Sequence, residues 1–150
     1  MKIVIDTNVF VSGIFFTGPP YRILEAWRDG RLQPVISQEM VDEYQRVVDA
    51  LSKQYPAIDT IPILKFVDKN TKIIIAPGLP GPVCVDPDDD KFLACALAAG
   101  CKVIVSGDRH LLKVSGYCGV QVLKPREFVD RFLRSVSAKR SVGPVFPPAC

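Results

Sequence analysis

Two short apolar runs in this chain lead into aspartates. Residues 2–6 end in Asp6, and the run Val103–Ser106 is followed by Asp108. Both runs are rich in β-branched residues and too short for a lone helix, so they predict buried strands. Parallel strands place their carboxyl ends at one edge of a sheet, where open α/β folds bind ligands. A carboxylate buried there is costly without a neutralising positive group, so the pattern predicts a bound metal ion.

The rest of the chain alternates between strand and helix patterns. We expect further strands at Gln33–Ser37, Lys72–Ala76 and Val120–Leu123, and helices over residues 9–16, 21–28, 38–51, 63–68, 91–99 and 125–134. Alternation of this kind favours a parallel sheet covered on both faces, with right-handed crossovers. The predicted fold class is therefore α/β, a three-layer α/β/α arrangement around a central, mostly parallel sheet.

Length and composition indicate one domain. The 150 residues are enough for a substantial core, and we expect the domain to cover residues 1–134. Periodicity stops after Arg134, and Gly143 with three prolines predicts a flexible C-terminal tail over residues 135–150. The net charge of +3 is compatible with a polyanionic partner without indicating one. There is neither an apolar run long enough to span a membrane nor a signal-peptide pattern, so we expect a cytoplasmic protein.

The cysteines and the single histidine argue against a zinc site. The five cysteines form no C-x-x-C pair, and His110 is the only histidine. Cys95 and Cys101 are expected to be small buried apolar residues. His110 is expected at the surface or in a cap.

Glu43 is the acid of its helix best placed to reach inward. The helix over residues 38–51 carries an apolar stripe that includes Met40, Tyr44 and Val48. At 100° per residue Glu43 lies at the border of this stripe. Ser37 precedes the helix and is expected to cap it.

The acidic run Asp86–Asp90 opens the next helix. Asp86 has the position of an N-cap, and Asp89 that of the acid in a capping box. Asp90 differs, because a helical wheel places it on the same face as Leu93, which should be buried. Capping does not require an acid there, so Asp90 is predicted to be a site residue.

Four acids therefore fall at strand ends or in the helices that follow them: Asp6, Glu43, Asp90 and Asp108. Like charges in one pocket repel, so either protons or a cation must join them. Ligands that are all oxygen favour a hard ion, Mg²⁺ or Mn²⁺. Asn8 and Ser106 are accessory candidates that could hydrogen-bond the carboxylates or a bound water, and a plain turn role stays open for both.

These residues resemble those of the PIN-domain family of metal-dependent ribonucleases. The matching pieces, in order, are Asp6-Thr-Asn8, Ser37-Gln-Glu-Met-Val-Asp-Glu43, Asp86-Pro-Asp-Asp-Asp90-Lys-Phe-Leu, Val103-Ile-Val-Ser-Gly-Asp108 and Pro125-Arg-Glu-Phe128. The resemblance covers residues 1–134 and implies a PIN-like nuclease domain. It carries the four family acids over to Asp6, Glu43, Asp90 and Asp108, as catalytic residues that hold Mg²⁺ or Mn²⁺.

The resemblance also implies an activity and partners. We expect an endoribonuclease that hydrolyses phosphodiester bonds of RNA, leaving 5′-phosphate and 3′-hydroxyl ends. The compact chain is most similar to the toxin half of prokaryotic toxin–antitoxin pairs. The candidate partners are an RNA substrate, an antitoxin protein and a second copy of the chain. We expect no membrane partner. One metal ion or two are both compatible with the four acids.

Two other functions share part of this pattern. An RNA-binding or interaction module could keep the fold without catalysis, but four negatively charged acids facing phosphate would not favour RNA binding. Haloacid-dehalogenase or receiver phosphotransfer enzymes also use an aspartate after the first strand. Haloacid-dehalogenase enzymes need a second aspartate where this chain has Asn8. Receiver domains need an acidic pair near the first strand, and this chain has none there.

Overall fold

A computed structural model describes residues 1–134, and the expected tail at residues 135–150 lies outside the described residues. The strands are β1 (Lys2–Ile5), β2 (Gln33–Pro34), β3 (Ile36–Ser37), β4 (Ile73–Ile74), β5 (Val103–Val105) and β6 (Gln121–Leu123). The α-helices are α1 (Thr7–Phe15), α2 (Pro19–Arg28), α3 (Gln38–Ser52), α4 (Ile61–Asn70), α5 (Asp90–Ala98), α6 (Arg109–Lys113) and α7 (Pro125–Phe128). Short 3₁₀ turns form η1 (Pro87–Asp89) and η2 (Tyr117–Gly119), and a π-helical turn forms η3 (Val129–Leu133).

The central sheet is parallel and has the strand order β2-β1-β5-β6. Ile5 of β1 lies opposite Val105 of β5, and Val105 lies opposite Leu123 of β6. Strands β3 and β4 form a second parallel pair. The side chains of Ile5 and Val105 are fully buried, as expected for parallel strands that are covered on both faces. This register places the residues that follow β1 and β5 side by side.

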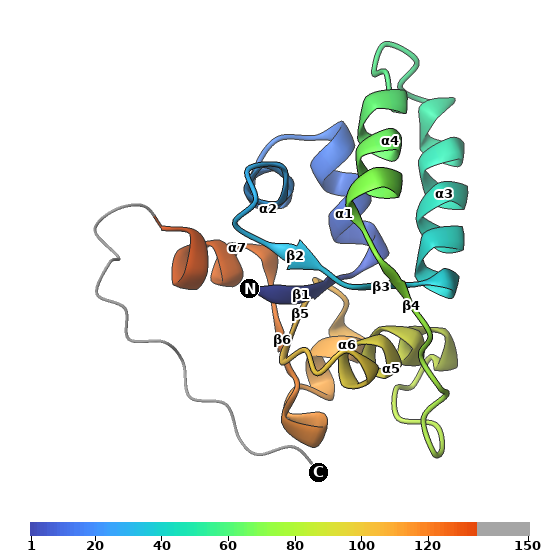
Figure 1. Ribbon diagram of the computed structural model, residues 1–150, viewed down its shortest axis with the longest axis vertical. Helices are drawn as coiled ribbons and strands as arrows, with labels where there is room; N and C mark the ends of the chain where they lie inside the picture. The colour runs from blue at the N-terminus through green and yellow to red at the C-terminus, as the bar shows by residue number, and fades with distance from the viewer. Residues whose placement is uncertain (135–150) are drawn as a thin grey trace.

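The expected three-layer α/β/α fold is confirmed. Helices α1 to α4 gather on one side of the strands, and α5 and α6 lie on the other side (Figure 1). Helix α5 packs directly against β1 and β5, and α1 packs against both α2 and α3. None of the helices described in residues 1–134 combines the length and apolarity needed to cross a membrane.

Helix α3 follows the pattern expected from the sequence. Ser37 caps it by accepting a hydrogen bond of 3.4 Å from the backbone N–H of Met40. Met40, Tyr44 and Val48 form its buried stripe. The side chain of Glu43, beside this stripe, is only 14% exposed, so it does reach inward.

Three segments differ from the sequence expectations. The strand expected over Gln33–Ser37 is divided at Val35, because its first half pairs with β1 and its second half with β4. Helix α6 was not expected, since five residues are too few to show a helical period. The last helix keeps α-helical bonding only to Phe128 and continues as the turn η3. Cys95 and Cys101 are buried, as expected.

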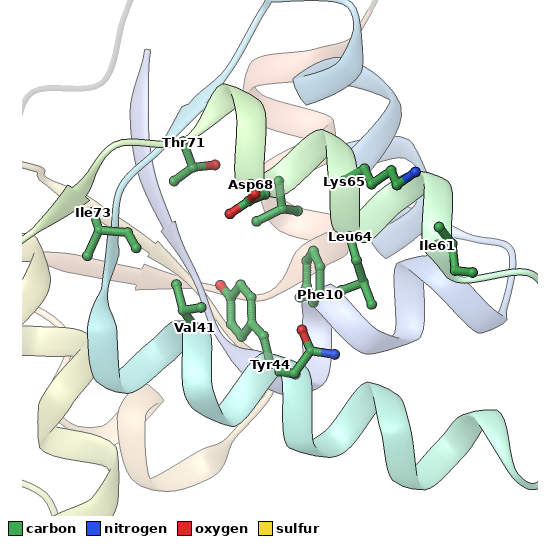
Figure 2. A pocket seen from close by; sticks show the side chains of 11 residues that line it. Phe10, Val41, Tyr44, Ile61, Leu64, Lys65, Asp68, Thr71 and Ile73 are labelled. Carbon is green, nitrogen blue, oxygen red and sulfur yellow. The ribbon is translucent and has the colours of Figure 1, made fainter.

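A cavity of about 310 Å³ lies between α1, α3 and α4 (Figure 2). Phe10 and Tyr44 stack at its base with ring centroids 4.3 Å apart. Thr71 also lines the cavity, and its hydroxyl is buried without a hydrogen-bond partner in the described part of the chain. The four acids expected to hold metal do not line it, so this cavity is separate from the site described next.

Candidate metal site at the carboxyl edge of the sheet

Asp6 and Ser106 meet where β1 and β5 end. The backbone N–H of Asp6 donates to the carbonyl of Val105 at 3.0 Å, which continues the strand pairing by one residue. The hydroxyl of Ser106 donates to Oδ2 of Asp6 at 2.6 Å. The side chain of Ser106 is fully buried and Asp6 is 5% exposed. A short bond from a neutral donor to a buried carboxylate fixes the orientation of the Asp6 side chain.

Ser106 also connects Asp6 to the second strand-end acid. Its Oγ accepts a hydrogen bond of 2.9 Å from the backbone N–H of Asp108. Asp108 is the N-cap of α6, because its Oδ1 accepts from the backbone N–H of His110 at 2.7 Å. The two aspartates are thus held at the same edge of the sheet by one serine.

Asp89 is the third acid of this edge. It ends the turn η1, whose N-cap is Asp86. The Asp89 side chain is 13% exposed, and its Oδ2 is buried with no hydrogen-bond partner in residues 1–134. One carboxylate oxygen each from Asp89 and Asp108 and one ring nitrogen of His110 lie within 4.8 Å of one another. The sequence assigned Asp89 to a capping box, and this assignment is wrong because its side chain makes no capping bond.

Asp90 has a different set of contacts. Its Oδ1 accepts from the N–H of Cys84 at 2.8 Å, and its Oδ2 accepts from the N–H of Val83 at 3.1 Å. Both oxygens therefore bind the loop that precedes η1. Partial burial raises the pKa of Asp90, but the hydrogen bonds from Cys84 and Val83 outweigh it and hold the pKa below its usual value. The structure does not bring Asp90 into the group formed by Asp89, Asp108 and His110.

Glu43 lies near Asp6 and forms ion pairs with two basic residues. The hydroxyl of Thr7 donates to its Oε1. Its Oε2 lies 3.1 Å from Nζ of Lys91 and 3.6 Å from the guanidinium of Arg46. Lys91 is 7% exposed and also binds Asp88 at 2.9 Å. Burial lowers the pKa of Lys91, but Asp88 and Glu43 together hold it above its usual value, so this lysine is charged.

The acids at the sheet edge repel one another. Burial is the largest effect on Asp6 and raises its pKa; bonds from Ser106 and from the backbone at Asn8 lower it, and the charges of Asp108 and Glu43 raise it further. The result is a pKa above the usual value. Burial, and next the charges of Asp108, Asp86 and Asp6, raise the pKa of Asp89 to about 6. None of the lysine or arginine ion pairs in residues 1–134 includes Asp6, Asp89 or Asp108.

A divalent cation fits this arrangement. Within residues 1–134 the buried oxygen of Asp89 has no hydrogen-bond partner, and a cation would supply one. The strand-end aspartates on the same edge would supply further hard oxygen ligands. Of the accessory candidates, Ser106 is bonded to Asp6. Asn8 is exposed, and together with Gly107 and Asp108 it lines a shallow depression at the end of the strands.

Comparison with known proteins identifies the family of this chain. A family model described as "PIN domain" matches residues 2–110. The chain belongs to the PIN-domain family. The uncharacterized protein MJ1680 of Methanocaldococcus jannaschii is 27% identical over 148 residues, which cover 91% of this chain and 95% of that protein. No solved structure gives a significant match.

PIN domains are generally nucleases that use a divalent metal, and this PIN domain has an acidic cluster where such an ion would bind. Sequence reasoning did not place Asp89, Thr7 or His110 beside the strand-end acids. A signal existed for one of them: the N-cap pattern that begins at Asp108 would have revealed α6, and a helix starting there brings the ring of His110 back toward the acids.

Proposed function

We propose that this PIN domain is a Mg²⁺- or Mn²⁺-dependent endoribonuclease, with the ion bound by Asp6, Asp89 and Asp108. The observation that carries the proposal is the buried oxygen of Asp89, which has no hydrogen-bond partner in residues 1–134. It faces Asp108 at the sheet edge where parallel α/β folds bind ligands. Glu43 completes the acidic site from α3, and Asp90 supports it by holding the loop.

The bound ion would polarise a phosphate oxygen and lower the pKa of the water that attacks phosphorus. The chain's own residues orient the ligands. Ser106 donates to Oδ2 of Asp6, which fixes the orientation of this carboxylate at the sheet edge. The N-cap bond to His110 fixes Asp108 in the same way. No histidine base is required for this hydrolysis.

Lys91 limits the negative charge that an RNA phosphate meets. It neutralises Glu43 at 3.1 Å and Asp88 at 2.9 Å. Each phosphate carries a negative charge, so an acidic site repels it unless cations compensate. With Lys91 in place, the uncompensated acids are those that would bind the ion.

The test uses purified full-length protein stripped of metal with EDTA. A single-stranded RNA labelled at one end is incubated with increasing Mg²⁺ or Mn²⁺, and a DNA of the same sequence runs in parallel. We expect metal-dependent cleavage of the RNA, with 5′-phosphate ends that a ligase accepts. Asp6→Asn and Asp108→Asn should abolish cleavage and keep the fold. Asp49→Asn, an exposed acid on α3, is the matched control and should cleave normally.

The outcomes separate the candidate functions. Full activity of the Asp6→Asn, Asp108→Asn double variant would reject the assignment of these acids. RNA binding without cleavage at any metal concentration would favour the catalytically silent RNA-binding or interaction module. Cleavage of the DNA alone would keep the nuclease and overturn RNA as the substrate.

We further propose that the nuclease acts in the cytoplasm as the toxin of a toxin–antitoxin pair. Support comes from the compact PIN domain and the resemblance of its motifs to toxin-type members. Induced expression should then arrest growth of the host, and Asp6→Asn should relieve the arrest. Normal growth under strong expression of active protein would contradict the toxin role. A co-purifying small partner encoded beside the gene would be the antitoxin.

A further inference from the structure

The ring of His110 lies between two of the acids. Its Nδ1 is 3.9 Å from Oδ2 of Asp89 and 3.9 Å from Oδ1 of Asp108. The backbone N–H of His110 is bound to Asp108, so the start of α6 fixes where the ring emerges. The side chain is 31% exposed, and within residues 1–134 the ring makes no hydrogen bond.

These separations fit a shared ion better than direct bonds. A hydrogen bond between the ring and a carboxylate needs about 2.7–3.2 Å, which is well short of the observed distance. Ligand atoms that lie about 2.0–2.2 Å from one ion can be as much as ~4.3 Å apart. One cation can therefore contact the ring nitrogen and either oxygen without any movement of the backbone.

The donor set then departs from oxygen alone. Mg²⁺ strongly prefers oxygen ligands and keeps several waters, whereas imidazole suits first-row transition metals. Asp89 brings a buried oxygen without a hydrogen-bond partner in the described chain, and His110 brings a nitrogen with the same lack. The sequence, which predicted four carboxylates, gave no reason to separate Mn²⁺ from Mg²⁺.

We propose that His110 is a nitrogen ligand of the cation and makes this site prefer a first-row transition metal, with Mn²⁺ as the probe, over Mg²⁺. The proposal rests on the proposed function, because it assigns a ligand to the same ion. The competing role for His110 is an ion pair with Asp89 and Asp108, with no bond to metal.

The chain offers an unambiguous spectroscopic test, because His110 is its only histidine. Full-length protein is prepared without a histidine tag and loaded with Mn²⁺ alone. Electron spin-echo envelope modulation then reports any imidazole nitrogen bound to the manganese. We expect the nitrogen signal in the natural protein and its loss in His110→Asn. The signal of the natural protein decides the question even if the variant folds poorly.

Calorimetry of both ions measures the selectivity. We expect His110→Asn to lower the preference for Mn²⁺ over Mg²⁺ about tenfold, because imidazole binds first-row transition metals better than it binds Mg²⁺. Loss of even a residue that only hydrogen-bonds a metal ligand changes the metal affinity about 10–100-fold. Arg109→Asn is the matched control, because this exposed neighbour should change the affinity for both ions alike.

Three results are distinguishable. A nitrogen signal together with the selectivity change supports the proposal. Mn²⁺ bound without nitrogen modulation and with unchanged selectivity overturns it, assigns His110 to the ion pair and leaves the proposed nuclease site intact. Failure of the natural protein to bind either ion overturns the proposed function itself, and this inference with it.

Discussion

Asp89→Asn should stabilise the metal-free protein at neutral pH. In the folded chain, burial and the charges of Asp108, Asp86 and Asp6 raise the pKa of Asp89 from 3.8 to about 6. The folded protein therefore holds a proton on Asp89 more tightly than the unfolded chain does. Between about pH 4 and pH 6, stability falls as pH rises, because the folded state must give up that proton against the neighbouring charges.

The size of the effect follows from the pKa difference. One pKa unit corresponds to about 1.4 kcal/mol, so the loss approaches ~3 kcal/mol at pH 7.5 and is only about 1 kcal/mol at pH 4.5. Asparagine has nearly the same shape and no charge, so it avoids this loss. The variant should gain about 1–3 kcal/mol over the natural protein at pH 7.5, and less at pH 4.5.

Urea unfolding in EDTA at the two pH values measures this directly. Asp49→Asn is the control, since an exposed acid changes stability by no more than about 0.5 kcal/mol. Addition of Mg²⁺ or Mn²⁺ should reverse the order, because ligand binding stabilises only a folded state that binds it. Two results would refute the placement of Asp89 among these charges. One is equal stability of Asp89→Asn and the natural protein at pH 7.5 without metal. The other is an equal gain in stability of both proteins when metal is added.

Three further substitutions test the contacts around the site. Ser106→Ala should cost about 1–3 kcal/mol in urea unfolding, because Oδ2 of Asp6 loses a buried donor. Lys91→Met should lower the free energy of unfolding by about 3 kcal/mol, because it leaves the charge of Glu43 poorly compensated. A double variant with Glu43→Gln should recover part of this loss, and strictly additive effects of the two substitutions would contradict the pairing. Asp90→Ala should cost about 1–3 kcal/mol and speed proteolysis at Val83 and Cys84, whose N–H groups it frees.

The strand-end acids could be predicted because the sequence marks where the strands end. Apolar runs determine β1 and β5, and their register brings Asp6 and Ser106 together. Glu43 could also be placed, since a regular helix fixes the angle between it and the buried stripe that contains Tyr44. In both cases the prediction used one element of regular geometry at a time.

The contacts of Asp89 and Asp90 could not be predicted in this way. The wheel assumed α-helical geometry through the acidic run, but Pro87–Asp89 forms a 3₁₀ turn with three residues per turn. The direction of the Asp89 side chain relative to α5 therefore does not follow from the α-helical angle of about 100° per residue. A helical wheel also places Asp90 on the buried face of the helix, but it does not show which segment packs over that face. The cover is a loop that offers two N–H donors, and an irregular loop leaves no periodic signal.

The acidic run Asp86–Asp90 divides its roles among adjacent residues. Asp86 caps the turn, Asp88 pairs with Lys91, and Asp90 holds the loop. Among these acids, Asp89 alone has a buried oxygen without a hydrogen-bond partner in residues 1–134. The two neighbours should therefore respond with opposite signs: removal of the Asp90 carboxylate destabilises the metal-free protein, and removal of the Asp89 charge stabilises it. A metal ligand is expected to show the second sign, because the uncompensated charge that binds the ion destabilises the metal-free protein.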